Sequence, residues 1–244
     1  MRELHTVPDL REAAEDDSLV LWAAQGLAPG VRAWTAGGAV AVASPGLSRR
    51  DRLAVRGPAR AATALVRHAL AELGPGYRPL GDSALMGELL GALPALRPVS
   101  PFRWMELTGT GLDAGPPARL LTPAELPEAA ELLDTAYPAS YAHPLRPGCR
   151  GWAGVRDQAG RLTALAADAW SSPEVGYLAG VAAHPAHGRG RGHAEAACRL
   201  LLDAMLRRCQ RAALMVDHDN PAAIRLYERL GLSRRDMTAT YVEG

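Results

Sequence analysis

The sequence predicts an α/β (α+β) fold, a mixed central sheet flanked by helices, and three observations support this class. Residues 175–183 form a near-continuous apolar run, which is typical of a central strand buried on both faces. A loop rich in glycine and arginine follows that run and leads into an amphipathic helical pattern over residues 194–206. Further along, apolar runs alternate with helical patterns, which favours helices packed on the faces of one sheet.

The length of 244 residues exceeds one minimal domain and fits two domains of ordinary size. Residues 109–117 are rich in Gly and Pro and are a plausible linker. We therefore expect one domain over residues 1–115 and a second over residues 116–244. The formal net charge is only +1, so no global field favours nucleic acid or an anionic membrane.

The three cysteines point to a reducing compartment. Their number is odd, they lack the spacing of metal ligands, and Cys198 and Cys209 lie too far apart along one predicted helix to pair. No segment has the length of a signal-peptide core or of a membrane span. We expect a cytoplasmic protein that binds neither membrane nor nucleic acid.

The first half of the chain carries weaker patterns, with Gly and Pro between the runs. Residues 59–73 have apolar side chains at helical spacing, and residues 102–108 alternate like a strand. The expected elements of this half are helices over 10–17, 59–73 and 86–93, and strands over 18–24, 31–44 and 102–108.

The second half is clearer. Thr122-Pro-Ala-Glu125 is a capping box with Pro at the first helical position, and the helix that it opens runs to about Ala136. Asn220 and Pro221 begin a later helix that Gly231 ends. The other expected elements are a hairpin over 152–156 and 162–170, and strands over 175–183, 212–216 and 236–242. Their order is α, β, β, β, α, β, α, β.

The loop before the helix at 194–206 has the character of an anion site. Its glycines let successive backbone N–H groups turn toward one point, and the helix N-terminus adds unpaired donors and a positive dipole end. Arg189 and Arg191 add charge at the rim. A diphosphate is the expected ligand.

A weak internal repeat is also visible. Arg56-Gly-Pro-Ala-Arg-Ala61 precedes a helix, as Arg189-Gly-Arg-Gly-His-Ala194 does. The first copy is degenerate, because Pro58 has no N–H to donate and the second glycine is missing.

Other functions for the loop fit less well. Its glycines follow neither the dinucleotide-binding pattern nor the P-loop pattern, which requires Gly-Lys-Ser/Thr. Arg/Gly tracts that bind RNA are repeated and disordered, whereas this stretch is single and flanked by apolar elements. His184, His187 and His193 have no carboxylate or cysteine at ligand spacing, so no metal site is expected.

The helix after Asn220 carries candidate functional side chains on one face. Asn220, Ala223 and Tyr227 are spaced so that this face carries an amide, a small residue and a phenol. A small residue at 223 leaves room for a slim group against the helix. A phenol with a pKa of ~10 can protonate a departing thiolate whose thiol has a pKa of ~8.5. Core packing beside Ile224 is the alternative role for Tyr227.

Two motifs make residues 120–242 resemble the GNAT acyltransferase superfamily. Arg189-Gly-Arg-Gly-His-Ala194 matches the pyrophosphate loop Arg/Gln-x-x-Gly-x-Gly/Ala, and residues 220–232 resemble Asn-x-x-Ala-x-x-x-Tyr-x-x-x-Gly-Phe, with Leu232 for Phe. One extra residue precedes the Arg, so a second register with His187 in the Arg position stays open. The tandem arrangement, with a degenerate first copy, is similar to glycine-N-acyltransferase-like proteins.

The resemblance implies a GNAT-like fold, two tandem copies and acetyl-CoA (coenzyme A) as cofactor. Tyr227 would be the general acid for the departing thiolate, and Asn220 an anchor for pantetheine or for the backbone. The residues that the resemblance assigns to the cofactor are Val181, Ala182, Ala183, Arg189, Gly190, Arg191, Gly192, His193, Ala194, Asn220, Ala223 and Tyr227.

The general base is the open question. Members of the superfamily often carry a carboxylate in the middle of the strand before the loop, where this chain has Tyr177-Leu-Ala-Gly180. Glu174 at the start of that strand and Asp168 on the strand before it are the candidates, and Glu174 is the predicted catalytic carboxylate. Without a strong base, a weakly basic amine could react through a water.

We therefore expect an N-acetyltransferase that moves an acetyl (acyl) group from acetyl-CoA to a primary amine of a small molecule or peptide by direct attack. The alternative is a non-catalytic acyl-CoA-binding regulatory module. The acceptor pocket would involve residues 137–149, and the first domain is a further candidate for its wall. The sequence leaves the amine and the oligomeric state open.

Overall fold

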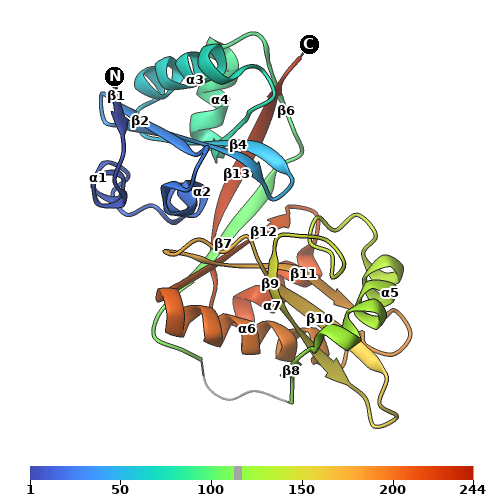
Figure 1. Cartoon of the computed structure of the whole chain (residues 1–244). Coiled ribbons are helices and arrows are strands. Elements are labelled where there is room, and N and C mark those ends of the chain that lie inside the picture. Colours follow the sequence, from blue (N-terminus) through green and yellow to red (C-terminus); the bar gives the residue numbers. More distant parts are fainter. Residues whose placement is uncertain (113–116, 244) are drawn as a thin grey trace.

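The computed structural model describes residues 1–112 and 117–243. The expected boundary between residues 115 and 116 lies outside the described residues, as does part of the expected linker. The mixed α/β fold with a central sheet flanked by helices is confirmed (Figure 1).

The described strands join into one sheet. Their order is β1-β2-β3-β4-β5-β13-β7-β12-β11-β10-β9-β8, and β6 pairs with β13 beside this path. The strands are β1 (Arg2–Leu4), β2 (Arg32–Ala36), β3 (Ala39–Leu47), β4 (Arg50–Arg56), β5 (Arg78–Asp82), β6 (Leu96–Pro98), β7 (Phe102–Thr108), β8 (Arg119–Leu120), β9 (Cys149–Arg156), β10 (Leu162–Ala169), β11 (Gly176–Ala183), β12 (Arg211–Asp217) and β13 (Ser233–Val242).

Helices cover both faces of this sheet because the strands alternate their buried side chains. In β3, Val40 and Val42 pack in the cluster that contains α2, whereas Ala41 and Ala43 pack with α3. None of the described helices is both long and apolar enough to cross a membrane. The helices are α1 (Val7–Ala13), α2 (Ser18–Ala24), α3 (Ala59–Leu73), α4 (Ser83–Ala92), α5 (Leu126–Ala136), α6 (His193–Cys209) and α7 (Pro221–Arg229), with 3₁₀ turns η1 (Gln25–Leu27) and η2 (Pro123–Glu125).

The same unit of strand, helix and parallel strand occurs in each half of the chain. β4 and β5 are parallel and are joined through α3, and β11 and β12 are parallel and are joined through α6. The two copies of the internal repeat expected from the sequence lie at the strand-to-helix turns of these two units. The first loop offers no comparable donors, because Pro58 lacks an N–H and Arg56 pairs with Glu15 and Asp17.

The two halves exchange their last strands. β13, from the end of the chain, pairs with β5 of the first half, while β7, from the first half, pairs with β12. β7 and β13 also pair with each other over Ser233↔Glu106 to Met237↔Phe102. Figure 1 shows these two strands crossing between the upper and lower parts of the molecule.

Two expectations for the first 24 residues were wrong. Ser18–Ala24 is the helix α2 rather than a strand, because the Asp17 side chain caps it by accepting from the Val20 N–H at 3.0 Å. All seven of its side chains are buried, so its sequence is apolar on every side and shows no helical period. The helix expected over 10–17 is α1, which starts earlier because Thr6 caps it and Pro8 lies in its first turn.

Aromatic rings from three elements form a core that both halves share. Trp22 of α2 stacks on Tyr177 of β11 with 4.6 Å between ring centroids, and it lies 5.5 Å from the ring of Trp104 in β7. Trp22 also donates its indole N–H to the Trp170 carbonyl at 2.9 Å. The first half is therefore packed against the strand that carries the second half's loop.

This shared core predicts cooperative unfolding. We expect Trp22→Ala to lower the free energy of unfolding by about 3–5 kcal/mol, because it leaves a cavity beside Tyr177 and Trp104. Urea titrations followed by far-UV circular dichroism and by tryptophan fluorescence should shift together. If one part of the Trp22→Ala variant still unfolded at the urea midpoint of the wild type, this result would contradict the shared core.

Candidate active site

The site begins where two parallel strands separate. β11 and β12 pair only at Gly176↔Ala212 and Tyr177↔Ala213. Beyond that point β11 follows β10 instead, and its register to β10 shifts between Ala179 and Ala182. Gly180 at this bulge has a φ of +58°, a conformation that favours glycine. The bulge turns β11 away from β12 and leaves the facing edge of β11 unpaired.

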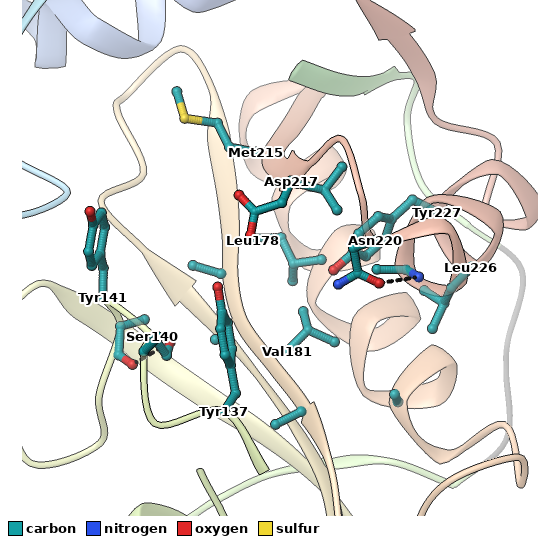
Figure 2. A pocket seen from close by; sticks show the side chains of 18 of the residues that line it. Tyr137, Ser140, Tyr141, Leu178, Val181, Met215, Asp217, Asn220, Leu226 and Tyr227 are labelled. Atoms are coloured by element: carbon teal, nitrogen blue, oxygen red, sulfur yellow. Dashed lines mark hydrogen bonds between the residues drawn. The ribbon is translucent and has the colours of Figure 1, made fainter. Parts of the chain in front are cut away.

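A cavity of about 1040 Å³ occupies this opening. Figure 2 shows Tyr227 and Asn220 on its α7 side, Tyr137 and Tyr141 on the opposite side, and Asp217 between them. Residues from the opened part of β11 and from the end of β12 form its walls. Of the sequence-predicted site residues, these line it: Val181, Ala182, Ala183, Arg189, Gly190, Gly192, His193, Ala194, Asn220, Ala223 and Tyr227.

The loop between β11 and α6 presents free backbone donors. In the described structure, no backbone N–H of residues 189–194 donates a hydrogen bond to another residue. Gly190 and Gly192 have φ values of +71° and +73°, and Gly192 is the N-cap of the 17-residue helix α6. The unpaired amides and the positive end of the helix dipole together favour an anion.

Two contacts hold the loop in place. Gly188 is packed so closely that a Cβ there would lie 2.0 Å from the Thr163 carbonyl oxygen. The Thr163 hydroxyl donates to the Val155 carbonyl at 2.9 Å, so it accepts from the His193 Nδ1–H at 2.7 Å. Because Nδ1 carries that proton, Nε2 of His193 is left for other contacts. Arg191 does not line the cavity.

The start of α7 combines a cap with an open amide group. The Asn220 side-chain oxygen accepts from the Ala223 N–H at 3.1 Å, which leaves its NH₂ group without a role in the cap. At the mouth of the cavity, Glu195 of α6 pairs with Arg229 of α7 at 2.9 Å. This ion pair ties α7 to the first turn of α6, the helix that begins at the end of the loop.

Tyr227 is buried, yet its hydroxyl group is free. Only 6% of the residue is exposed, and its hydroxyl has no hydrogen-bond partner among the described residues. Burial raises the pKa of Tyr227 well above its usual value, and the nearby Cys198, Tyr137 and Tyr177 act in the same direction. The hydroxyl therefore stays protonated at neutral pH and can donate a hydrogen bond into the cavity.

The carboxylates suggested by the sequence lie elsewhere. Glu174 precedes β11, at the paired end of the strand, and does not line the cavity. Asp168 is buried, accepts from the Ser171 hydroxyl, and pairs with Arg208 at 3.0 Å. The structure brings neither carboxylate to the opened edge of β11.

Several cavity residues were not among the site residues predicted from the sequence. Asp217 ends β12 and lines the cavity. Desolvation raises the pKa of Tyr137, and Asp217 adds to this shift. Arg50, Arg52 and Arg78 reach the same cavity from the first half. The strand-end position of Asp217 is the one pattern that could have marked it. Among the described residues there is no group of His, Cys, Asp and Glu that could hold a metal ion.

Comparison with known proteins agrees with this geometry. Residues 121–232 match the family model described as Acetyltransferase (GNAT) family. No curated protein matches the chain.

Solved structures resemble the chain over most of its length. A GCN5-related N-acetyltransferase from Kribbella flavida is 21% identical, covers 99% of this chain and 97% of its own, and has a TM-score of 0.62. A putative acetyltransferase of the GNAT family from Novosphingobium aromaticivorans is 24% identical over 78% of this chain and 84% of its own, with a TM-score of 0.51. At these identities the likeness concerns the fold. Residues 121–232, which carry the opened strand pair, the loop and α7, are thus the part of the chain that matches the GNAT acetyltransferase family model.

Proposed function

We propose that the protein is an N-acetyltransferase that moves an acetyl group from acetyl-CoA to a primary amine by direct attack. The observation that carries the proposal is a shared cavity: it is lined by loop residues with free amides (Arg189, Gly190, Gly192, His193 and Ala194), by the unpaired edge of β11 and by Tyr227. The family match of residues 121–232 supports acetyl transfer in general.

The residues present suit a CoA thioester. The free amides of residues 189–194 and the N-terminus of α6 match a diphosphate, with Arg189 at the cavity wall. The unpaired edge of β11 over Val181–Ala183 offers backbone donors and acceptors to the amide groups of a pantetheine arm. When bound, acetyl-CoA supplies a thioester carbonyl that an amine can attack.

Tyr227 would act on the departing sulfur. A thiol of CoA type has a pKa of ~8.5, below that of a buried phenol, so full proton transfer from Tyr227 is uphill. A hydrogen bond donated by the neutral hydroxyl still stabilises negative charge that develops on sulfur. The raised pKa of Tyr227 therefore favours hydrogen-bond donation to the sulfur over complete transfer of the proton.

Asp217 would accept the proton from the attacking amine. It is a cavity carboxylate at the end of β12, beyond Ala213, the last residue of β12 that pairs with β11, and it has no ion-pair partner among the described residues. Removing a proton at pH 7 from an amine with a pKa of 10.4 requires about 4–5 kcal/mol, so a base near the reacting nitrogen has a large effect. We prefer Asp217 to Glu174 because Glu174 lies outside the cavity.

The first experiment separates transfer from binding. Calorimetry with CoA measures affinity, and thiol release from acetyl-CoA across a panel of primary amines measures turnover. Binding with amine-dependent thiol release supports the proposal. Binding without turnover for any amine would instead support a non-catalytic acyl-CoA-binding module, and absence of CoA binding would contradict both.

Tyr227→Phe should lower kcat about 10²-fold, because it removes one donor to the developing charge on sulfur. The affinity for CoA should stay nearly unchanged. Since the functional form is protonated and burial raises the pKa of Tyr227, the wild-type rate should not fall through tyrosine ionisation below pH ~10. Tyr241→Phe is the matched control, because Tyr241 is 40% exposed and lies outside the cavity. Equal kcat values for Tyr227→Phe and wild type would remove Tyr227 from the mechanism.

Asp217→Asn should lower kcat/KM about 10²-fold at pH 7. The deficit should shrink as the pH approaches the pKa of the amine, because the free amine then no longer needs a base. A pH–rate series for wild type and variant measures this convergence. Asp219→Asn, an exposed carboxylate outside the cavity, is the control. A deficit that is constant at every pH would point to positioning rather than proton transfer.

A further inference from the structure

Three arginines from the first half line one end of the cavity. Arg50 and Arg52 are alternate residues of β4, so they share one face of the sheet. Arg78 of β5 is the register partner of Arg52 in the parallel β4–β5 pair, which places it beside Arg52. We refer to Arg50, Arg52 and Arg78 as the arginine cluster.

No carboxylate of the described chain lies within ion-pair distance of the arginine cluster, whereas many other arginines are paired. Arg52 is only 8% exposed, and its one hydrogen bond runs from Nε to the Leu47 carbonyl at 3.4 Å. Arg50 reaches only the Tyr141 hydroxyl, at 3.2 Å. The terminal guanidinium nitrogens of Arg52 are therefore left for a group in the cavity.

A buried cation without a counter-ion is unfavourable, and an arginine side chain does not escape by losing its proton. Burial lowers the pKa of Arg52 despite the opposing influence of Tyr177 and Tyr141, and Arg50 and Arg78 act in the same direction as burial. Arg156 shows the opposite case, because Glu128 and Glu125 raise its pKa. The arginine cluster thus lacks the negative partner that the partly buried Arg156 possesses.

The position of the arginine cluster separates it from the phosphate loop. Arg50 contacts Tyr141, and Figure 2 shows Tyr141 on the side of the cavity opposite Tyr227 and α7. Tyr177, which lines the same cavity as Arg52, is the last residue of β11 that pairs with β12. An anion at the arginine cluster is therefore on the acceptor side of the reaction, away from residues 189–194.

We propose that the acceptor is a primary amine that also carries an oxyanion, a carboxylate or a phosphate, and that Arg52 and Arg78 bind this oxyanion. The inference rests on the proposed acetyl transfer and adds the class of substrate. Guanidinium groups bind both oxyanions through paired, charge-assisted hydrogen bonds. Arg50, nearer Tyr141, adds positive charge at the entrance.

Matched amine pairs test the charge requirement. Glycine, alanine and aspartate are each compared with their carboxamides, and O-phosphoethanolamine is compared with ethanolamine, in the acetyl-CoA thiol-release assay. We expect kcat/KM to be about 10- to 100-fold higher for the anionic member of at least one pair. The carboxylate pairs and the phosphate pair distinguish the two oxyanions. Equal or higher turnover of every neutral member would overturn the inference and leave acetyl transfer standing.

Variants assign the preference to the arginine cluster. Arg52→Gln and Arg78→Gln should raise KM for the anionic amine about 10- to 100-fold, with little change for the neutral amine or for CoA affinity. Arg52→Lys should recover part of the loss. Arg78 is half-buried, so Arg78→Gln still tests the proposal if Arg52→Gln does not fold. Arg60→Gln, an exposed arginine of α3 outside the cavity, is the control. Equal losses for both members of a pair, or weaker CoA binding, would contradict an acceptor site.

A binding measurement separates this inference from acetyl transfer itself. In the presence of saturating CoA, N-acetylglycine and N-acetylglycinamide are compared by thermal shift. A rise in Tm with N-acetylglycine but not with N-acetylglycinamide, absent in Arg78→Gln, supports the oxyanion site. If this rise is seen but no amine is turned over, the proposed acetyl transfer is wrong and the oxyanion site stands. Equal shifts with both compounds, or with wild type and Arg78→Gln, would refute the site.

Discussion

The separation of β11 from β12 after two paired residues is the constraint on which the cavity depends. Adjacent parallel strands normally continue their ladder, and here the left-handed backbone at Gly180 ends it. Trp152 fixes the bulge, because a Cβ on Gly180 would lie 2.7 Å from its ring. The strand edge is left unpaired inside the molecule, where only a ligand or water can satisfy its polar groups.

The cavity belongs to both halves of the chain. The second half supplies the loop, the opened strand edge and α7, while the first half supplies the arginine cluster. The strand exchange and the Trp22–Tyr177 stack hold these two walls in a defined relation. The first half thus contributes to the site although its own loop, with Pro58, cannot bind an anion as residues 189–194 can.

Features encoded over a short stretch were predictable from the sequence. The helix over 59–73, the strand over 102–108 and the cap at Asn220 were all confirmed, because each depends on a local period or cap. The helix at Ser18–Ala24 was missed because burial on all sides removes its period. Asp217 and the arginine cluster meet the loop only through sheet topology, so no local pattern could join them.

The exchanged strands also bear on how such a chain could be divided. Without β7, the strand β12 would expose a row of unpaired N–H and C=O groups, and without β13 so would β5. A fragment limited to residues 121–232 would expose the edge of β12, and this edge could pair with a strand from another molecule. The amino-terminal half, although its own loop is inactive, thus has a structural role: its strand β7 covers the edge of β12 in the second half.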